Sequence, residues 1–184
     1  AWRLAEGAVP YRDLFDMNCP GVYLLHLSVL RALGPGDLAW RLFDLPWLAG
    51  AALAAAAFAA PWGRLAAGVA AGSLMLYHLA AGAWQTGQRD FLLCPLLLLG
   101  ALGVARWAEG AGVTALFAGG VALGAGLTIK PHAVVFVVAL LAFIAVRAGV
   151  AGRTGRAAVA VGALLGGGVL APIAVGVWGS EEHT

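Results

Sequence analysis

The chain has 184 residues, of which 62% are hydrophobic and only 11% are charged, and its formal net charge at pH 7 is +2. A soluble domain carries about 25% charged residues, so this composition excludes an ordinary soluble protein and indicates a membrane protein. The small and scattered charge also excludes a nucleic-acid-binding protein, which would present a concentrated basic surface.

The first 36 residues are predicted to form an outer loop. Within them, residues 22–33 (VYLLHLSVLRAL) are apolar but too short to cross a bilayer, which needs roughly 17 to 25 residues. Proline and glycine bound this segment on both sides. We therefore predict a juxtamembrane helix that lies in the plane of the membrane interface.

Residues 37–184 are predicted to form a bundle of membrane-spanning helices. Runs such as AALAAAAFAA are strong helix formers, and the alternating pattern of a membrane strand is absent. Six apolar stretches are each about long enough to span the membrane, at residues 38–60, 65–84, 91–107, 111–129, 131–146 and 157–178. The predicted fold class is an all-α membrane protein with six spans.

The charges of the predicted turns indicate which side of the membrane each turn faces. The turns at 61–64, 105–112 and 147–156 hold five arginines against one acid, Glu109, whereas the other side has three basic residues over the same region. By the positive-inside rule the arginine-rich side is cytoplasmic. The turns at 84–90 and 128–132 are therefore predicted to face outward from a plasma (inner) membrane.

Three outward-facing segments carry most of the reactive side chains, and each has a structural alternative. Asp37, Arg41 and Asp44 lie on one face of a predicted helix. They either form a ladder of ion pairs along the helix, or Arg41 binds an anion. The turn WQTGQRD (84–90) either lies at the membrane–water interface with no further role or belongs to a functional site. In TIKPH (128–132), Lys130, the only lysine of the chain, either snorkels to the surface or binds phosphate.

Other polar or small residues within the spans are predicted to be structural. His78 lies on an otherwise apolar stretch and is interpreted as a hydrogen-bonded packing residue, and Cys94 as a small buried residue. Glycine spacings such as Gly120 to Gly124 and Gly162 to Gly166 are typical of close helix packing.

The segment EGAVPYRDLFDMNCPGVYLLHLSVLRALGPGDLAWRL resembles the first outer loop of polytopic glycosyltransferases of the GT-C class, which includes protein O-mannosyltransferases and the lipid A aminoarabinose transferase. The resemblance is carried by Gly7, Pro10-Tyr11-Arg12-Asp13, Pro20, the apolar helix, Gly34 and Ala39-Trp40-Arg41-Leu42. The later QRDFLL resembles the family's Arg-Asp position, and the match covers about residues 1–95.

This resemblance implies a cell-envelope enzyme that moves a sugar from a polyprenyl-phosphate donor to a glycan, lipid or protein acceptor on the outer face. A carboxylate would act as general base and cations would stabilise the lipid-phosphate leaving group. The implied catalytic residues are Asp13, Asp16 and Asp90. Phosphate and donor binding is assigned to Arg12, Arg41, Arg89, Lys130 and His132, and substrate lining to Tyr11, Gln85 and Gln88. No cofactor is certain, and a divalent metal held by the three aspartates stays open.

Members of the class usually carry the catalytic aspartate shortly before the G-x-x-P-Y segment, and this chain starts past that point. We therefore expect it to be an internal, N-terminal-half piece of a longer protein that lacks the main base unless Asp13 or Asp16 serves instead. Two alternatives stay open: a transporter or flippase-like component that binds a lipid phosphate or anion without reacting it, and a purely structural subunit. A transporter would carry polar residues at mid-membrane, whereas here they lie at one end of the spans.

Overall fold

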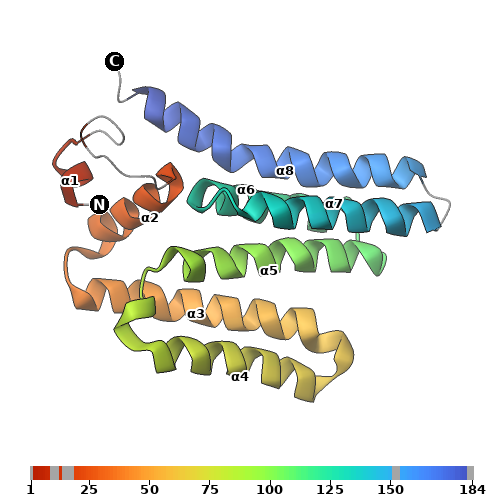
Figure 1. Ribbon diagram of the computed structural model, residues 1–184, viewed down its shortest axis with the longest axis horizontal. Helices are drawn as coiled ribbons and strands as arrows, with labels where there is room; N and C mark the ends of the chain where they lie inside the picture. The colour runs from red at the N-terminus through yellow and green to blue at the C-terminus, as the bar shows by residue number, and fades with distance from the viewer. Residues whose placement is uncertain (1, 9–12, 14–18, 151–153, 182–184) are drawn as a thin grey trace.

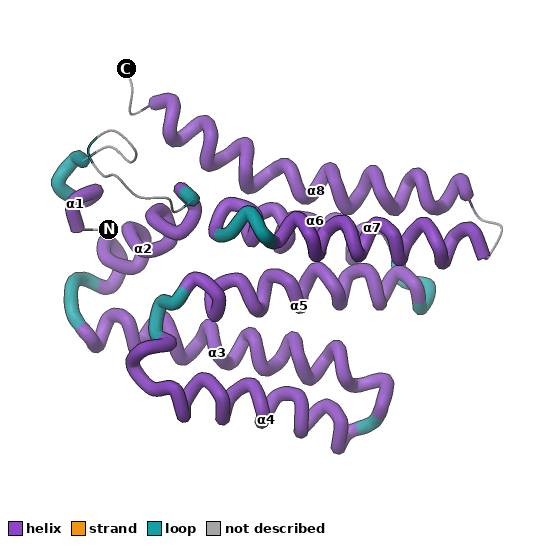
Figure 2. Tube along the Cα trace, in the orientation of Figure 1, coloured by secondary structure: helices purple, strands orange, loops and turns teal. Residues whose placement is uncertain are grey.

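The computed structural model of the protein describes residues 2–8, 13, 19–150 and 154–181, and these form helices and turns with no strand among them (Figures 1 and 2). The α-helices are α1 (Trp2–Ala5), α2 (Pro20–Leu33), α3 (Asp37–Ala59), α4 (Arg64–Ala81), α5 (Arg89–Ala108), α6 (Val113–Ile129), α7 (Ala133–Val150) and α8 (Thr154–Glu181). Two short 3-10 helices, η1 (Ala60–Trp62) and η2 (Gly82–Gln85), extend α3 and α4.

Helices α3 to α8 lie side by side and run in alternating directions (Figure 1). Across the bundle, α4 packs against α3, α3 against α5, α5 against α6 and α6 against α8, with α7 alongside α5, α6 and α8. The turns at 82–88 and 130–132 therefore gather at the end of the bundle where α2 lies, which we call the α2 end. The turns at 60–63 and 109–112 lie at the opposite end.

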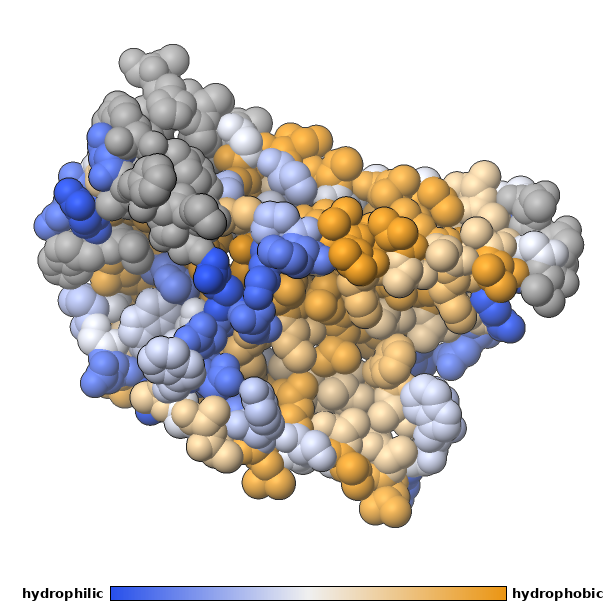
Figure 3. All heavy atoms as spheres, viewed as in Figure 1, coloured by the Kyte–Doolittle hydropathy of each residue, from blue (hydrophilic) through white to orange (hydrophobic). Residues whose placement is uncertain are grey.

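Four of these helical segments are long and apolar enough to cross a membrane: Asp37–Trp62, Arg64–Gln85, Arg89–Ala108 and Gly155–Gly176. A broad apolar surface covers the middle of the visible face, and hydrophilic residues gather toward the two ends (Figure 3). The prediction of a helical membrane protein is confirmed at this level. The helical segments Val113–Ile129 of α6 and Ala133–Gly149 of α7 are also apolar but are shorter than these four.

The predicted juxtamembrane helix is α2, which begins at Pro20 and ends where Gly34 adopts a φ of 85°. Its residue Val22 packs with Leu92 of α5 and Ile129 of α6 in one buried cluster. Gly21 lies so close to Thr128 that an added Cβ would overlap the threonine side chain. Helix α2 thus lies against the ends of α5 and α6 as well as against α3.

Helix α7 begins two residues later than the sequence predicts. Pro131 and His132 form a turn in which the Ala133 N–H donates to the Lys130 carbonyl at 3.1 Å. This turn holds Lys130 at the α2 end, immediately after α6.

Close packing of α6 on α8 depends on glycine, as predicted, but with different partners. A Cβ on Gly120 or Gly124 would overlap the backbone oxygen of Leu164 or Gly168 on α8. By contrast, Gly162 and Gly166 are exposed and have no heavy atom within 4 Å of an added Cβ. The prediction for these two glycines is wrong, because the Gly162 to Gly166 stripe faces away from α6.

Candidate functional site

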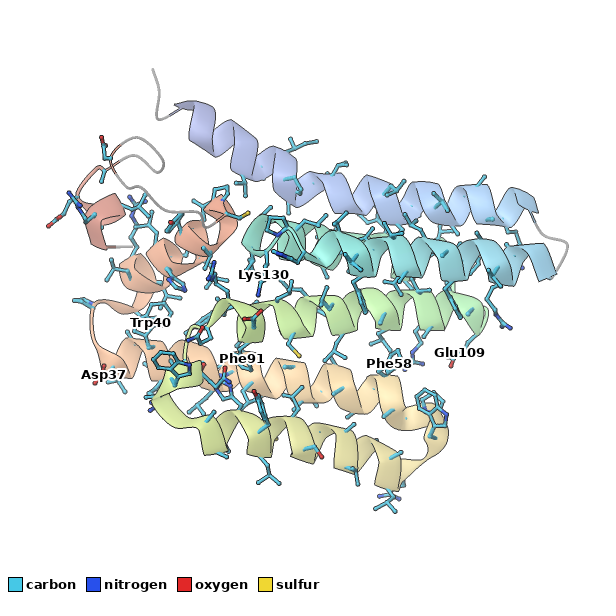
Figure 4. The ribbon with its side chains drawn as sticks, in the orientation of Figure 1. Asp37, Trp40, Phe58, Phe91, Glu109 and Lys130 are labelled. Carbon is cyan, nitrogen blue, oxygen red and sulfur yellow. The ribbon has the colours of Figure 1, made fainter. Side chains whose placement is uncertain are left out.

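A cavity of about 440 Å³ lies at the α2 end, between α2, α3 and the turn that joins α4 to α5. We call it the polar cavity, and its lining residues are His26, Asp37, Trp40, Arg41, Ala83, Thr86 and Gly87. Asp37 and Trp40 lie at the same end of the bundle as Lys130, far from Phe58 and Glu109 at the opposite end (Figure 4). The cavity thus joins residues that are about sixty positions apart in the chain, such as His26 and Gly87, whose sequence separation is 61.

Three contacts of the turn and α2 fix the walls of the polar cavity. The His26 Nε2–H donates to the Gly87 carbonyl at 3.2 Å, and the His26 ring meets Trp40 edge-on with ring centroids 4.9 Å apart. Gly87 has a φ of 70°, and a Cβ added there would lie 3.2 Å from the Trp40 ring. Glycine is therefore needed at this position both for its backbone conformation and for space.

Burial in the wall of the cavity favours the neutral form of the His26 imidazole. Burial of the ring lowers the pKa of His26 below its ordinary value, and the hydrogen bond to Gly87 offsets only part of this effect. Because a carbonyl oxygen only accepts, the proton of the neutral ring is on Nε2 and Nδ1 is the acceptor.

Asp37 and Arg41 line the cavity without protein partners among the described residues, and the lining residue Thr86 has a buried hydroxyl. Asp37 and Arg41 are exposed, and no ion pair joins them in the described part of the chain. The Thr86 Oγ1 atom is buried and has no hydrogen-bond partner there either. The ion-pair ladder weighed for Asp37, Arg41 and Asp44 is thus not formed.

Asp90 and Lys130 form an ion pair beside the polar cavity, although they are 40 residues apart. Asp90 is in the first turn of α5, and Lys130 follows the last residue of α6. The Lys130 side chain is 30% exposed and that of Asp90 is 74% exposed, so solvent reaches both groups. The pair holds the ammonium group at the surface where α5 begins and α6 ends.

The other predicted site residues fall around these two features. Gln85 and Gln88 are half-buried in the turn next to the cavity, while Arg89 at the start of α5 and His132 before α7 are exposed. Asp13 is exposed, and Tyr11, Arg12 and Asp16 lie outside the described residues. The structure therefore places Arg41 at the polar cavity and pairs Asp90 with Lys130, and the assignment of a site to these residues stays a prediction.

The sequence reasoning did not assign His26, Thr86 or Gly87 to a site. A histidine in a short apolar helix was a usable signal, since such a residue needs a polar partner when buried. A glycine between two polar residues of a helix hairpin was a second signal, since it often marks a left-handed turn. Neither signal reveals that His26 and Gly87 are hydrogen-bond partners.

His78 of α4 donates a hydrogen bond from Nε2–H to Asp44 Oδ2 of α3, at 2.8 Å. Both side chains are buried, and the ring of Phe91 from α5 packs on the His78 ring with centroids 3.8 Å apart. The prediction that His78 is a hydrogen-bonded packing residue is confirmed. Asp44 turns away from Arg41 to make this contact.

An apolar groove of about 750 Å³ runs between α3 and α5, with a lining that shares no residue with the polar cavity. Phe43 and Trp47 line the groove, and Trp40 lines the cavity. Their rings form one row along α3, with centroids 6.1 Å apart for Trp40 and Phe43 and 5.5 Å apart for Phe43 and Trp47. We call this the aromatic row, and it links the polar and apolar spaces.

No protein-family model, curated protein or solved structure matches the chain. Within the described ranges, no three histidine, cysteine, aspartate or glutamate side chains are grouped as metal ligands.

Proposed function

We propose that the protein is a membrane glycosyltransferase that moves a sugar from a polyprenyl-phosphate-linked donor to an acceptor on the extracytoplasmic face. The observation that carries the proposal is the aromatic row, which joins a polar cavity with charged walls to an apolar groove along α3 and α5. Such a pair of spaces suits an amphipathic lipid, whose head group needs polar partners and whose chain needs an apolar surface.

Cationic groups at the α2 end suit the leaving group of this reaction. Arg41 lines the cavity, Lys130 and Arg89 lie close by at the ends of α6 and α5, and Arg12 belongs to the preceding loop. A lipid phosphate is already a stable anion, so cations that hold it in place supply most of the catalysis needed at that group. His132 in the neighbouring turn is a further donor for the same anion.

A carboxylate is needed on the acceptor side to take the proton of the attacking hydroxyl. Asp90 is our candidate among the described site residues that lie beside the cavity, with Asp13 and Asp16 of the loop as the other two. Tyr11, Gln85 and Gln88 would contact the substrates.

In this proposal all six helices from α3 to α8 cross the membrane, and α2 lies in the outer interface. The alternating directions of α3 to α8 support the count, since an even number of crossings brings the 82–88 and 130–132 turns to one side. The arginines of the opposite turns support an outward orientation of the α2 end.

The test is a transfer assay with the full-length protein in detergent micelles and a panel of polyprenyl-phosphate sugars. Arg41→Gln and Lys130→Met should each lower turnover about 100-fold or more, which is typical for the loss of one group that stabilises a developing anion. Arg106→Gln, at the opposite end of the bundle, is the matched control and should leave turnover unchanged. Normal transfer by both site variants would contradict the assignment.

The second candidate is a non-enzymatic transporter or flippase-like component that binds the same lipid phosphate. One observation favours it: the Asp90 carboxylate already contacts the Lys130 ammonium group, so the candidate base has a protein partner where an acceptor hydroxyl would have to bind. A protein that binds polyprenyl phosphate but yields no glycosylated product from any donor and acceptor in the panel would support this candidate.

A further inference from the structure

We infer that the polar cavity holds the sugar ring itself, as a neutral polyhydroxylated ligand, and that the phosphate group lies outside the cavity. The inference deepens the proposed function and rests on it for the place of the sugar in a reaction. Its physical basis is the mixture of groups in the cavity wall, which differs from that of an anion site.

The two charged side chains of the wall offer opposite hydrogen-bonding capacities. The Arg41 guanidinium only donates, and the ionised Asp37 carboxylate only accepts. A sugar hydroxyl both donates and accepts, so vicinal hydroxyls satisfy an aspartate and an arginine at once. A phosphate offers acceptors and negative charge, so Asp37 would repel it and stay unpaired.

Thr86 supplies a third polar group that needs a partner. Its Oγ1 atom is buried and has no hydrogen-bond partner within the described residues, although the residue lines the cavity. A buried polar atom without a partner costs about 1–3 kcal/mol, so native proteins rarely leave one unsatisfied. A ligand hydroxyl in the cavity satisfies the threonine, which can donate or accept.

Trp40 gives the cavity an apolar wall whose position is fixed before a ligand arrives. The ring of His26 meets it edge-on from α2, and Phe43 meets it at 85° one turn along α3. A sugar ring has an apolar C–H face as well as polar edges, so one aromatic wall opposite polar groups matches its shape. A wall that is already ordered avoids part of the entropic cost of binding.

The size of the cavity fits this occupant. Its volume of about 440 Å³ is near the lower end of the usual range for small-molecule sites, roughly 300–1,000 Å³. The polyprenyl chain would have its own space in the apolar groove, whose lining residue Phe43 contacts Trp40 of the cavity. The phosphate would then lie between the two, within reach of Arg41 on one side of the cavity mouth.

The test measures sugar binding without requiring transfer. The full-length protein in micelles is mixed with methyl mannoside, methyl glucoside and methyl arabinoside, and binding is followed by saturation-transfer NMR. We expect at least one glycoside to bind with a Kd in the millimolar range. Asp37→Asn and Thr86→Val should each weaken it about tenfold, as expected for the loss of one hydrogen bond to a charged or buried group.

Two matched variants and one rescue keep the result specific. Glu109→Gln and Thr114→Val, at the opposite end of the bundle, should leave glycoside binding unchanged, and Thr86→Ser should retain it because the hydroxyl remains. Inorganic phosphate should not compete with the glycoside. Failure of all three glycosides to bind, unchanged binding in both site variants, or displacement by phosphate would overturn the inference.

The same variants separate this inference from the proposed function. Glycoside binding that depends on Asp37 and Thr86 in a protein without transferase activity supports the sugar site and contradicts the glycosyltransferase. Sugar transfer that survives both substitutions contradicts the sugar site and leaves the glycosyltransferase standing.

Discussion

His78 on α4 donates a hydrogen bond to Asp44 on α3 across 2.8 Å, and the two side chains are only 3% and 1% exposed. The pair joins α3 to α4, and the ring of Phe91 from α5 packs on the imidazole. It therefore connects α3, which carries one wall of the polar cavity, to α4 and α5, which are joined by the turn that forms another wall.

Removing one partner of this buried pair should destabilise the bundle strongly. Asp44→Ala or His78→Ala leaves the other polar group buried without its partner, which typically costs about 3–5 kcal/mol. Replacing both residues with leucine removes both polar groups together, and we expect the double variant to unfold at a free energy close to that of the wild type. The measurement is the free energy of unfolding of each variant in micelles.

The control for this comparison is Ser73→Ala on the same helix as His78, outside the buried pair. Its free energy of unfolding should match that of the wild type. If the double leucine variant were as unstable as either alanine variant, the expectation would be wrong. The pair would then stabilise the bundle by more than giving each buried polar group a hydrogen-bond partner.

Glycine substitutions should affect stability differently at the contact between α6 and α8 and on the exposed face of α8. Gly120→Ala and Gly124→Ala force a Cβ into the backbone of α8 and should cost about 1–3 kcal/mol, as overpacking does. Gly162→Ala and Gly166→Ala add a methyl group to open space and should be neutral or stabilising by up to about 1 kcal/mol. Thermal unfolding of the four variants in parallel is the measurement, and equal losses at all four positions would contradict the packing.

Helices were predictable from the sequence because long apolar runs bounded by charged turns permit little else, and each of the helices α2 to α8 overlaps a predicted segment. Pairwise contacts were not predictable, since a histidine on an apolar helix does not reveal its partner. Asp44 illustrates this: its spacing from Arg41 favours an ion pair along one helix, but burial makes the contact with His78 the better one. The polar cavity was missed because its walls come from α2 and from a turn about sixty residues later.

The exposed ion pair of Asp90 and Lys130 should matter for function and little for stability. Exposed pairs contribute about 0–1 kcal/mol, because water screens the charges and holding two side chains in place costs entropy. Asp90→Asn should therefore change the free energy of unfolding by less than about 1 kcal/mol and lower sugar transfer sharply. Unfolding and turnover are measured on the same preparation, and a large loss of stability would show a structural role instead.

The proposed orientation predicts which turns are reached from outside the cell. A cysteine introduced in place of exposed Trp84 should react with an impermeant maleimide added to intact cells. A cysteine in place of Ala111, in the turn after α5, should react only after the membrane is opened. Both are made in a background that lacks Cys19 and Cys94, and the reverse labelling pattern would overturn the orientation.

Acid should weaken the attachment of α2 through His26. In the unfolded chain a histidine titrates near its ordinary pKa of about 6.5, whereas burial lowers the pKa of His26 in the folded protein. Between these two values the unfolded state binds more protons than the folded state, so the free energy of unfolding falls as the pH falls. The loss begins as the pH drops through about 6.5 and levels off below the folded-state pKa.

His26→Gln tests this effect, because glutamine keeps an N–H donor for the Gly87 carbonyl and does not titrate. Between pH 7.5 and pH 5 the wild type should lose more stability than this variant does, and the difference is the contribution of His26. His132→Gln is the control, since that ring is exposed in its turn and makes no comparable contact with α2. If the free energy of unfolding changed with pH in the same way for the wild type and His26→Gln, the imidazole would titrate alike in the folded and unfolded states. That result would contradict the burial of His26 at the wall of the cavity.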